Sequence, residues 1–176
     1  MRIIAGTHKG RVIIAPQNLP VRPTTDFAKE GLFNILNNEI NFENTTALDL
    51  FCGTGNISYE LASRGCAHVT SVDLHANCIK FVQETCKKFQ FQNIKAMKAN
   101  SFLYLKQCSR KFNIIFADPP YANENYNDIP NLVFENNLLE IEGLLIVEHP
   151  AEISFGKHPN FYRHKNYGNV NFSFFR

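Results

Sequence analysis

The sequence predicts an α/β fold in which a doubly wound, mostly parallel sheet has helices on both faces. Three observations indicate this. Short apolar runs alternate with helix-like segments through the middle of the chain, an order that a mostly parallel sheet with right-handed crossovers requires. The first of these runs ends in a loop with two closely spaced glycines, as in nucleotide-binding sheets. Two alternating segments joined by a turn lie near the C-terminus, so we expect the last strand to be antiparallel.

The composition is that of an ordinary globular protein of one domain. The chain has 176 residues, of which 44% are hydrophobic and 19% charged. None of its apolar runs approaches the ~20 residues that a bilayer requires, and the first residues lack the long apolar core of a signal peptide. We therefore expect a cytoplasmic protein that does not contact a membrane.

The five cysteines are odd in number and form no C-x-x-C pair, so they indicate reduced thiols instead of a disulfide framework or a zinc site. Cys52 lies in the glycine loop, but no activating base is visible near it in the sequence. This favours a small packing residue over a nucleophile. No bound metal is expected.

The N-terminal part is predicted to be an extension of the main domain. Residues 1–16 indicate a small β-hairpin, because two short apolar runs flank a turn with two glycines. Either of two adjacent threonines can cap the helix that follows, which runs to about Asn38. Its apolar side is predicted to consist of Phe27, Gly31, Leu32, Ile35 and Leu36. We expect the extension to cover residues 1–40 and the main domain to cover residues 41–176.

The stretch Ala47–Gly55, with the sequence ALDLFCGTG, is the most informative part of the chain. Its apolar residues indicate a buried strand, and Gly53 and Gly55 allow a tight turn and a close approach of the backbone to a ligand. Asp49 lies inside this strand, near its carboxyl end. Asp73 ends the next apolar run, where an acidic residue commonly binds ribose hydroxyls. Together these features favour a nucleoside cofactor over a glycine turn kept for packing alone.

The elements that follow alternate between helix and strand. The predicted helices are Asn56–Gly65, Ala76–Phe89, Phe102–Gln107 and Asn127–Asn137. The predicted strands are His68–Leu74, Asn93–Ala99, Phe112–Ala117 and Gly143–His149, with the tail segments Asn160–Lys165 and Val170–Arg176. The first helix is expected to be amphipathic, with Ile57, Leu61 and Ala62 on its apolar side. Glu148 can lie at the pocket or face solvent, and His149 is interpreted as structural.

A second motif, Asp118–Tyr121 with the sequence DPPY, follows the fourth strand of the alternating series. In a doubly wound sheet that strand can neighbour the glycine-loop strand across the switch point, so both motifs line one crevice. DPPY suits methylation of an exocyclic amino group on a ring, whose lone pair is delocalised. Asp118 and the carbonyl of Pro119 can accept its two N–H bonds. Pro120 stiffens the backbone, and the ring of Tyr121 can stack on a splayed-out base.

Basic residues gather towards both ends of the sequence, although the net charge is only +2. The first 25 residues have no acidic side chain and contain four basic ones, Arg2, Lys9, Arg11 and Arg22. From Lys157 onwards there are four basic residues and again no acidic one. This distribution fits a phosphate-rich partner, and ordinary solvated termini are the alternative.

The glycine-loop motif, the acid at Asp73 and DPPY together resemble the S-adenosylmethionine-dependent amino methyltransferases of the Rossmann-like class. The N-terminal motifs RIIAGxxKGR (Arg2–Arg11), RPTTD (Arg22–Asp26) and LFNIL (Leu32–Leu36) are similar to those of the RsmD family, bacterial 16S rRNA guanine-N2 methyltransferases. The resemblance spans nearly the whole chain and implies a seven-stranded sheet. It also implies transfer of a methyl group from S-adenosylmethionine to guanine N2 in 16S rRNA or the 30S subunit, leaving S-adenosylhomocysteine. We expect a monomer.

The resemblance also implies roles by position. It assigns cofactor binding to Asp49, Phe51, Cys52, Gly53, Gly55, Asp73, Leu74, Asn100, Ser101 and Asp118. Asp73 would bind the ribose hydroxyls and Leu74 would lie beside the adenine, while Asp49 would contact the methionine end. The target amino group is assigned to Asp118, Pro119, Pro120 and Tyr121. The basic residues Arg2, Lys9, Arg11 and Arg22 would contact RNA or order the N-terminal segment over the pocket. Asn100 stands where the family usually has an aspartate that binds the adenine amino group, and an amide oxygen can still accept that bond.

Alternatives remain open from the sequence. DPPY is compatible with methylation of adenine N6 or cytosine N4 in DNA, although no stretch is long enough for a separate target-recognition domain. A NAD-dependent oxidoreductase is disfavoured because Ser58 replaces the third glycine of the dinucleotide fingerprint and DPPY has no role in hydride transfer. A non-catalytic RNA-binding module would be expected to lose the motif residues, which are all present. DPPY as a simple strand-end turn is disfavoured by the glycine loop upstream.

Overall fold

A seven-stranded mixed sheet forms the centre of the computed structural model, which describes residues 1–16, 19, 25–120 and 125–176. Its strands are β1 (Thr46–Leu50), β2 (His68–Asp73), β3 (Ile94–Lys98), β4 (Phe112–Ala117), β5 (Leu139–His149), β6 (Phe161–Tyr167) and β7 (Val170–Phe175). They lie in the order β3-β2-β1-β4-β5-β7-β6, and β7 is antiparallel to both of its neighbours while the other pairs are parallel. The predicted fold class is confirmed, including the antiparallel last strand.

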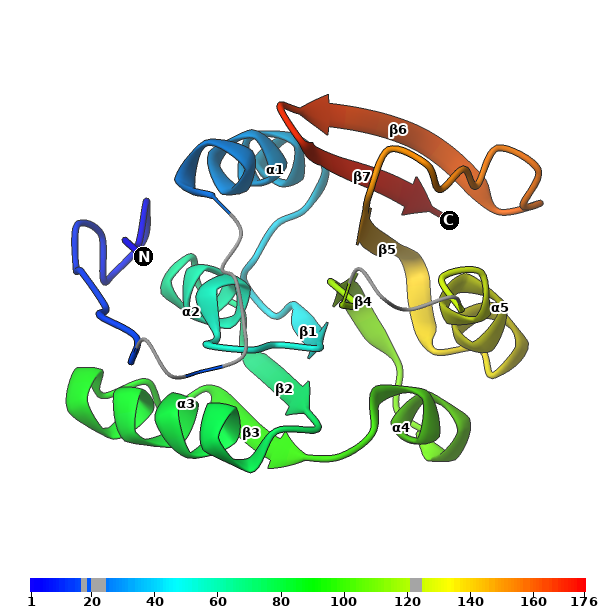
Figure 1. The fold of residues 1–176 in the computed structure, drawn as a ribbon. Coiled ribbons are helices and arrows are strands. Elements are labelled where there is room, and N and C mark those ends of the chain that lie inside the picture. The colour runs from blue at the N-terminus through cyan, green and yellow to red at the C-terminus, as the bar shows by residue number, and fades with distance from the viewer. Residues whose placement is uncertain (17–18, 20–24, 121–124) are drawn as a thin grey trace.

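Helices cover both faces of the sheet (Figure 1). They are α1 (Asp26–Glu39), α2 (Asn56–Ser63), α3 (Ala76–Phe89), α4 (Ser101–Gln107) and α5 (Asp128–Glu135). The first three lie on one face, and α4 and α5 lie on the other. Within the described parts of the chain, none of these helices is long and apolar enough to cross a membrane. The predicted helices and strands of the main domain are all present, with ends that differ by a few residues.

The order of the strands places a topological switch point between β1 and β4. β1 pairs in parallel with β2 on one side and with β4 on the other, so Leu50 is in register with both Val72 and Ala117. Doubly wound sheets bind ligands at the carboxyl ends of the strands at such a point. The glycine loop follows β1 and Asp118 follows β4, so the two motifs meet at this edge, as the sequence predicts.

Side chains along the strands alternate between two apolar layers, one on each face of the sheet. The layer that includes residues of α1 and α2 contains Ile114 and Phe116 of β4 together with Leu144 and Ile146 of β5. The layer that includes residues of α5 contains Ile115, Ala117, Leu145 and Val147. From Ile114 in β4 and Leu144 in β5 onwards, the even-numbered residues therefore face the layer of α1 and α2.

The predicted N-terminal hairpin is present only in part. Arg2 and Val12 form one isolated antiparallel bridge, and no longer strand pair is found in the described part of this segment. Ile3 still pairs with the facing chain, but the amides of Ile4 and Ala5 donate to Glu60 of α2 instead. Ile3 and Ile13 are buried in the same apolar layer as α1 and the sheet. The boundary that the sequence predicts between extension and main domain stays a prediction.

The apolar side of α1 differs from the predicted one. Leu32 and Leu36 are buried as expected, but Phe27 is 67% exposed and lies edge-on to Tyr167. The buried residues of α1 are Ala28, Lys29, Leu32, Phe33 and Leu36. The apolar pattern of the sequence does not predict the burial of Lys29, because a buried charge needs partners, and these come from other segments.

Helix α2 has Ile57, Leu61 and Ala62 buried in the core, as predicted, and its polar side is buried as well. The N-terminal segment, residues 1–16, covers its outer side through hydrogen bonds to Glu60. The two carboxylate oxygens of this fully buried side chain accept from the amides of Ile4 at 2.8 Å and Ala5 at 3.1 Å, and one of them also accepts from Nε of Arg64 at 2.8 Å. These charge-assisted bonds satisfy a carboxylate that burial alone would destabilise.

Lys29 completes this network from the side of α1. Its Nζ donates to the carbonyl of Arg2 at 2.6 Å and to Oδ1 of Asn56 at 2.8 Å, and lies 3.6 Å from Oε2 of Glu60. Burial lowers the pKa of Lys29, and the charge of Glu60 opposes that shift. Lys29 and Glu60, here called the charged clamp, thus join the N-terminal segment, α1 and the start of α2.

Candidate active site

The glycine loop turns sharply between β1 and α2. Phe51, Gly53 and Gly55 all have positive φ angles, of 58°, 51° and 82°. A side chain at Gly55 would meet the ring of Tyr59 at 2.8 Å, so the position requires glycine for space as well as for conformation. The amide of Gly55 donates to the carbonyl of Cys52 at 2.7 Å, which closes the turn. The loop therefore presents backbone instead of side chains next to the start of a helix.

Asp73 fixes this loop from the end of β2. Its carboxylate is buried and accepts from the amide of Gly53 at 2.8 Å through one oxygen and from that of His75 at 2.7 Å through the other. Each carboxylate oxygen can accept a further bond, so this arrangement still permits contact with ligand hydroxyls. Leu74 follows directly and is 55% exposed. An exposed apolar side chain beside a buried carboxylate suits the ribose and base of a nucleoside.

Asp49 lies one strand away, within β1. Its buried carboxylate accepts a hydrogen bond from Oγ of Ser58 on α2, and Ser58 Oγ lies 2.7 Å from Oγ of Ser71 on β2. Burial raises the pKa of Asp49 to about 7, and the negative charge of Asp73 adds to the shift. Ser58, which occupies the place of a third glycine, is thus a partner of Asp49.

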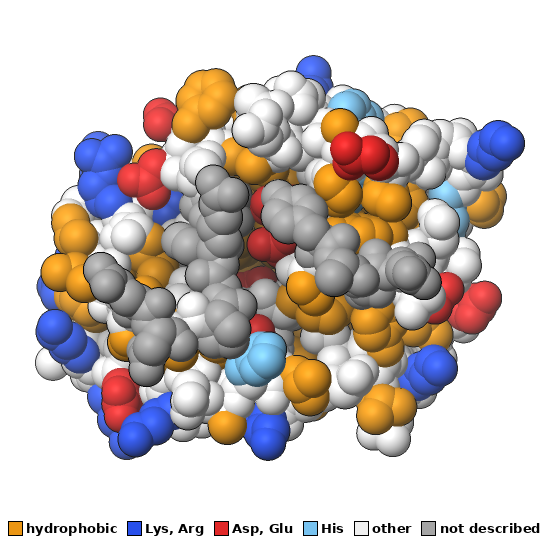
Figure 2. Space-filling view, in the orientation of Figure 1, with side chains coloured by type: hydrophobic (Ala, Val, Ile, Leu, Met, Phe, Trp, Pro, Cys, Tyr) orange, Lys and Arg blue, Asp and Glu red, His pale blue; other side chains and the backbone are white. Residues whose placement is uncertain are grey.

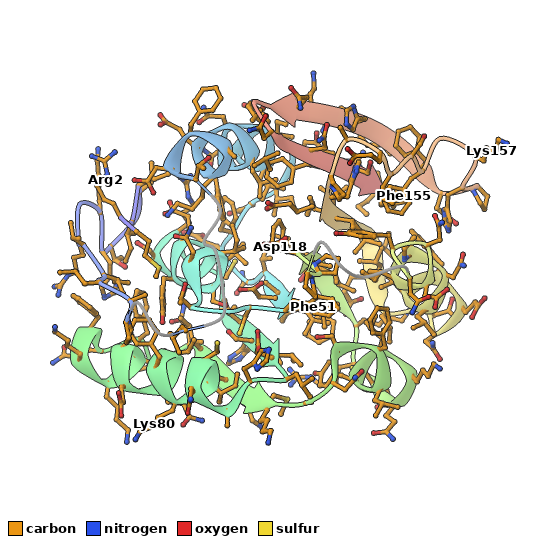
Figure 3. The ribbon with its side chains drawn as sticks, viewed as in Figure 1. Arg2, Phe51, Lys80, Asp118, Phe155 and Lys157 are labelled. Carbon is orange, nitrogen blue, oxygen red and sulfur yellow. The ribbon has the colours of Figure 1, made fainter. Side chains whose placement is uncertain are left out.

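Asp118 extends this row of acids to β4 and β5. Its amide donates to the carbonyl of Leu50 at 3.4 Å, which continues the pairing of β4 with β1 by one residue. Burial raises the pKa of Asp118 well above its usual range, and the negative charges of Glu148 and Asp49 raise it further. Glu148 is 4% exposed, which decides between the two positions that the sequence left open. Acidic side chains lie at the bottom of a hollow near the middle of the molecule (Figure 2), and Asp118 lies centrally (Figure 3).

The DPPY motif is described only in its first three residues, and Tyr121 lies outside the described residues. Pro119 is buried and Pro120 is exposed. The carbonyl of Pro119 accepts a long hydrogen bond, 3.4 Å, from the hydroxyl of the buried Tyr126. A carbonyl oxygen has two lone pairs, so one remains for a ligand.

Comparison with known proteins decides the family. A protein-family model described as "Conserved hypothetical protein 95" matches residues 1–176. The protein named Ribosomal RNA small subunit methyltransferase D of Escherichia coli strain K12 is 31% identical over 152 residues, which cover 86% of this chain and 76% of that protein. The chain belongs to the RsmD family.

Other members of the RsmD family support this membership. The protein named Ribosomal RNA small subunit methyltransferase D of Haemophilus influenzae is 33% identical over 153 residues, covering 84% of this chain and 78% of that protein. The candidate rRNA methyltransferase YlbH of Bacillus subtilis is 32% identical over 157 residues, covering 87% and 84%. Membership confirms the predicted class of enzyme, an S-adenosylmethionine-dependent methyltransferase.

Solved structures agree in fold. YhhF of Escherichia coli, described as a candidate methyltransferase, superposes with a TM-score of 0.88 at 28% identity, covering 99% of this chain and 96% of that one. A candidate methylase of Haemophilus influenzae gives a TM-score of 0.81 at 26% identity, covering 99% and 96%. SMU.776, a candidate methyltransferase in complex with S-adenosylhomocysteine, gives a TM-score of 0.64 at 20% identity over 84% of this chain and 49% of that one. That last likeness shows the fold alone.

The residues that line the switch point fit the cofactor of the RsmD family. The hydroxyl of Ser101, at the start of α4, is buried and has no hydrogen-bond partner among the described residues, so a ligand can satisfy it. The buried carboxylates of Asp49 and Asp73 and the side-chain-free backbone at Gly53 suit the amino and hydroxyl groups of S-adenosylmethionine. Cys52 is buried, and burial together with the charges of Asp49 and Asp73 raises the pKa of its thiol, which keeps it neutral.

Asn100 has a role in the structure that the sequence does not indicate. Its side chain is exposed, and Oδ1 accepts from the amides of Phe102 at 3.0 Å and Leu103 at 3.1 Å, which caps α4. A hydrogen bond from the adenine amino group would have to share Oδ1 of Asn100, which already accepts two hydrogen bonds. Adenine binding by Asn100 stays a prediction.

The four basic residues of the predicted RNA contact are only partly described. Arg2, Lys9 and Arg11 are exposed, and the guanidinium of Arg11 lies over the ring of Phe89 at 5.3 Å. Arg22 lies outside the described residues. Among the residues that the structure describes, no group of three or more His, Cys, Asp or Glu side chains is placed to bind a metal ion.

Proposed function

We propose that the protein transfers the methyl group of S-adenosylmethionine to the exocyclic N2 amino group of a guanine in 16S rRNA. The observation that carries the proposal is the position of Asp118, a half-buried carboxylate at the switch point, next to the glycine loop and followed by two prolines. The proposed RNA substrate is inferred from two relatives, which are named small-subunit rRNA methyltransferases. The exposed arginines and lysine of the N-terminal segment suit a phosphate backbone.

The chemistry required of the chain is modest. An amino group on a guanine ring is a poor nucleophile because its lone pair is delocalised into the ring. Asp118 accepts one N–H bond and the carbonyl of Pro119 accepts the other, which draws the lone pair out of the ring plane and stabilises the positive charge that develops on nitrogen. When bound, S-adenosylmethionine supplies an electrophilic methyl group on a sulfonium sulfur. The N–C bond forms as the S–C bond breaks, and the surplus proton on nitrogen passes to Asp118 and then to water.

Electrostatics in the hollow favour this arrangement. Several carboxylates close together raise one another's pKa, as Asp118 and Asp49 show, and a cation entering the hollow relieves that repulsion. A sulfonium cofactor and an amino group that becomes positive are both stabilised there. An anionic ligand would be repelled by the same charges. The hollow is therefore built for a reaction that develops positive charge.

The test is transfer of labelled methyl from S-adenosylmethionine to 30S subunits, free 16S rRNA and duplex DNA offered in parallel, with nucleoside analysis of the product. We expect N2-methylguanosine in one or both of the rRNA samples and none in the DNA. Methylated adenine or cytosine in the DNA sample would replace the proposal with a DNA amino methyltransferase. Absence of label from every sample, with the cofactor still bound, would contradict the assigned substrate.

A further inference from the structure

Asp118 has a second carboxylate beside it, that of Glu148 on the neighbouring strand. β4 and β5 are parallel, and Ala117 is in register with Val147, so Asp118 and Glu148 follow as the next pair at the carboxyl ends of the two strands. Towards these ends, the even-numbered residues of both strands face the layer of α1 and α2, so the two carboxylates point to the same side of the sheet. Their negative charges interact directly. Two acceptors thus stand side by side where the proposed reaction needs one.

The edge of guanine that carries the amino group matches this pair. Guanine presents two adjacent donors there, the ring N1–H and the N2 amino group. Adenine and cytosine present an amino group next to a ring nitrogen that only accepts. Enzymes that act on a base outside the stack select it by hydrogen bonds along this edge. A second carboxylate beside Asp118 therefore complements guanine and opposes the lone pair of the other two bases.

We propose that Glu148 selects guanine by accepting the hydrogen bond of its ring N1–H, while Asp118 accepts one from the amino group to be methylated. This inference rests on the proposed function and adds the residue that sets the choice of base. Glu148 takes no part in the methyl transfer itself. Its removal changes which base is accepted, whereas removal of Asp118 stops the reaction on every base.

The charge state of the pair supports an acceptor role in the loaded site. Burial and the neighbouring charge of Glu148 raise the pKa of Asp118 well above its usual range. A cationic cofactor in the same hollow favours the ionised form of Asp118. The pair then offers two negatively charged acceptors to a base with two donors. The positive charge of the cofactor thus helps to keep the pair available as acceptors for the target base.

The experiment exchanges one donor of the target base for an acceptor. The methylated position of 16S rRNA is mapped first, and a synthetic segment with either guanosine or 2,6-diaminopurine at that position is then ligated into the RNA. 2,6-Diaminopurine keeps the 2-amino group but has a ring nitrogen that accepts. We expect the full-length wild-type protein to methylate guanosine about tenfold faster or more, the discrimination typical of one specific hydrogen-bonded contact.

The variant Glu148→Gln tests the residue itself. Its amide can donate to the ring nitrogen of 2,6-diaminopurine, so we expect the ratio of the two rates to fall by about tenfold or more. Glu152→Gln, a change of the same kind at an exposed position near β5, is the control and should keep the wild-type ratio. Cofactor binding and thermal unfolding are measured in parallel to show that the Glu148→Gln protein is folded.

The outcomes separate the two proposals. Absence of N2-methylguanosine from wild-type reactions contradicts the proposed function. If that product forms, but wild-type protein methylates 2,6-diaminopurine as fast as guanosine, Glu148 does not select the base. An unchanged ratio in Glu148→Gln overturns the inference in the same way. If that variant does not fold, the wild-type comparison alone decides.

Discussion

The buried carboxylate of Asp49 at the switch point lowers the stability of the folded protein at neutral pH, and we attribute its presence to ligand binding. Asp49 is buried within β1, and its hydrogen bond from Ser58 does not compensate for the loss of water. Burial accordingly raises the pKa of Asp49 to about 7, against 3.8 for the free side chain. The folded protein binds this proton more tightly than the unfolded chain does. The stability that Asp49 contributes is therefore complete below pH 4 and is lost as the pH rises through about 7.

Replacing Asp49 with Asn tests this cost. The amide has nearly the same shape and can still accept from Ser58, but it carries no charge. We expect Asp49→Asn without cofactor to unfold at a higher temperature than the wild type at pH 8, by ~2–4 °C for each kcal/mol recovered in a chain of this size. At pH 4 the two proteins should unfold at nearly the same temperature. Thermal unfolding followed by circular dichroism measures both, and a variant less stable than the wild type at pH 8 would contradict the account.

At the scale of elements, the charged clamp of Lys29 and Glu60 holds the N-terminal segment and α1 against α2. Glu60 accepts three hydrogen bonds from two amides and Arg64, while Lys29 reaches both the carbonyl of Arg2 and the first residue of α2. That residue, Asn56, directly follows the glycine loop. The clamp thus connects the basic N-terminal segment to the start of the cofactor loop.

The two members of the clamp are not equivalent. Glu60→Ala leaves Arg64 and two backbone amides without their acceptor and Lys29 without the negative charge beside it, so we expect a loss of about 3–5 kcal/mol in the free energy of unfolding. Lys29→Met leaves Glu60 with its other three donors and should cost less. Urea denaturation measures both, and faster hydrogen exchange at the amides of Ile4 and Ala5 should mark Glu60→Ala alone. A loss below about 1 kcal/mol in the free energy of unfolding of Glu60→Ala would show that the charged clamp does not stabilise the fold.

Elements whose pattern reflects local chemistry were predictable from the sequence, and those held by distant partners were not. The strand β1, the glycine loop and the position of Asp118 follow from apolar periodicity and glycines. The burial of α2 and of Lys29 depends on pairing between segments that are far apart in sequence, which no local pattern contains. Phe27 was expected inside for its apolarity, yet the side of α1 that packs is set by its neighbours.

The candidate site shows the same division. Asp49 and Asp73 were predicted in the right place, because motif spacing fixes the ends of strands. The sequence left Glu148 open between pocket and solvent, since only the register of β5 against β4 brings it beside Asp118. The sequence assigns Asn100 to the adenine. The structure shows that its oxygen also caps α4, a second role that N-cap residues commonly have, and adenine binding stays a prediction.

At the scale of the whole molecule, Lys and Arg side chains lie around the rim of the view, while acidic side chains lie in the central hollow (Figure 2). Three of the basic residues, Arg2, Lys9 and Arg11, belong to the N-terminal segment. Arg2 and Lys157 lie at opposite sides of the view in Figure 3. We expect replacement of Arg2, Lys9 and Arg11 by Gln to weaken binding to rRNA. If each residue makes one phosphate contact, the slope of log K against log salt should fall by about 2, or ~0.7 per contact. Lys157→Gln is the matched control and should leave the slope unchanged. An unaltered slope in the triple variant would assign these residues to the fold alone.

The central claim, that Asp118 holds the amino group that is methylated, is tested most directly by Asp118→Ala. Rates of methyl transfer to rRNA and the affinity for S-adenosylmethionine are measured on the same preparations as the wild type. The account predicts a fall of about 10²-fold or more in rate, the usual effect of removing one group that stabilises charge in a transition state, with cofactor affinity largely kept. A variant that retains nearly the full rate would contradict it.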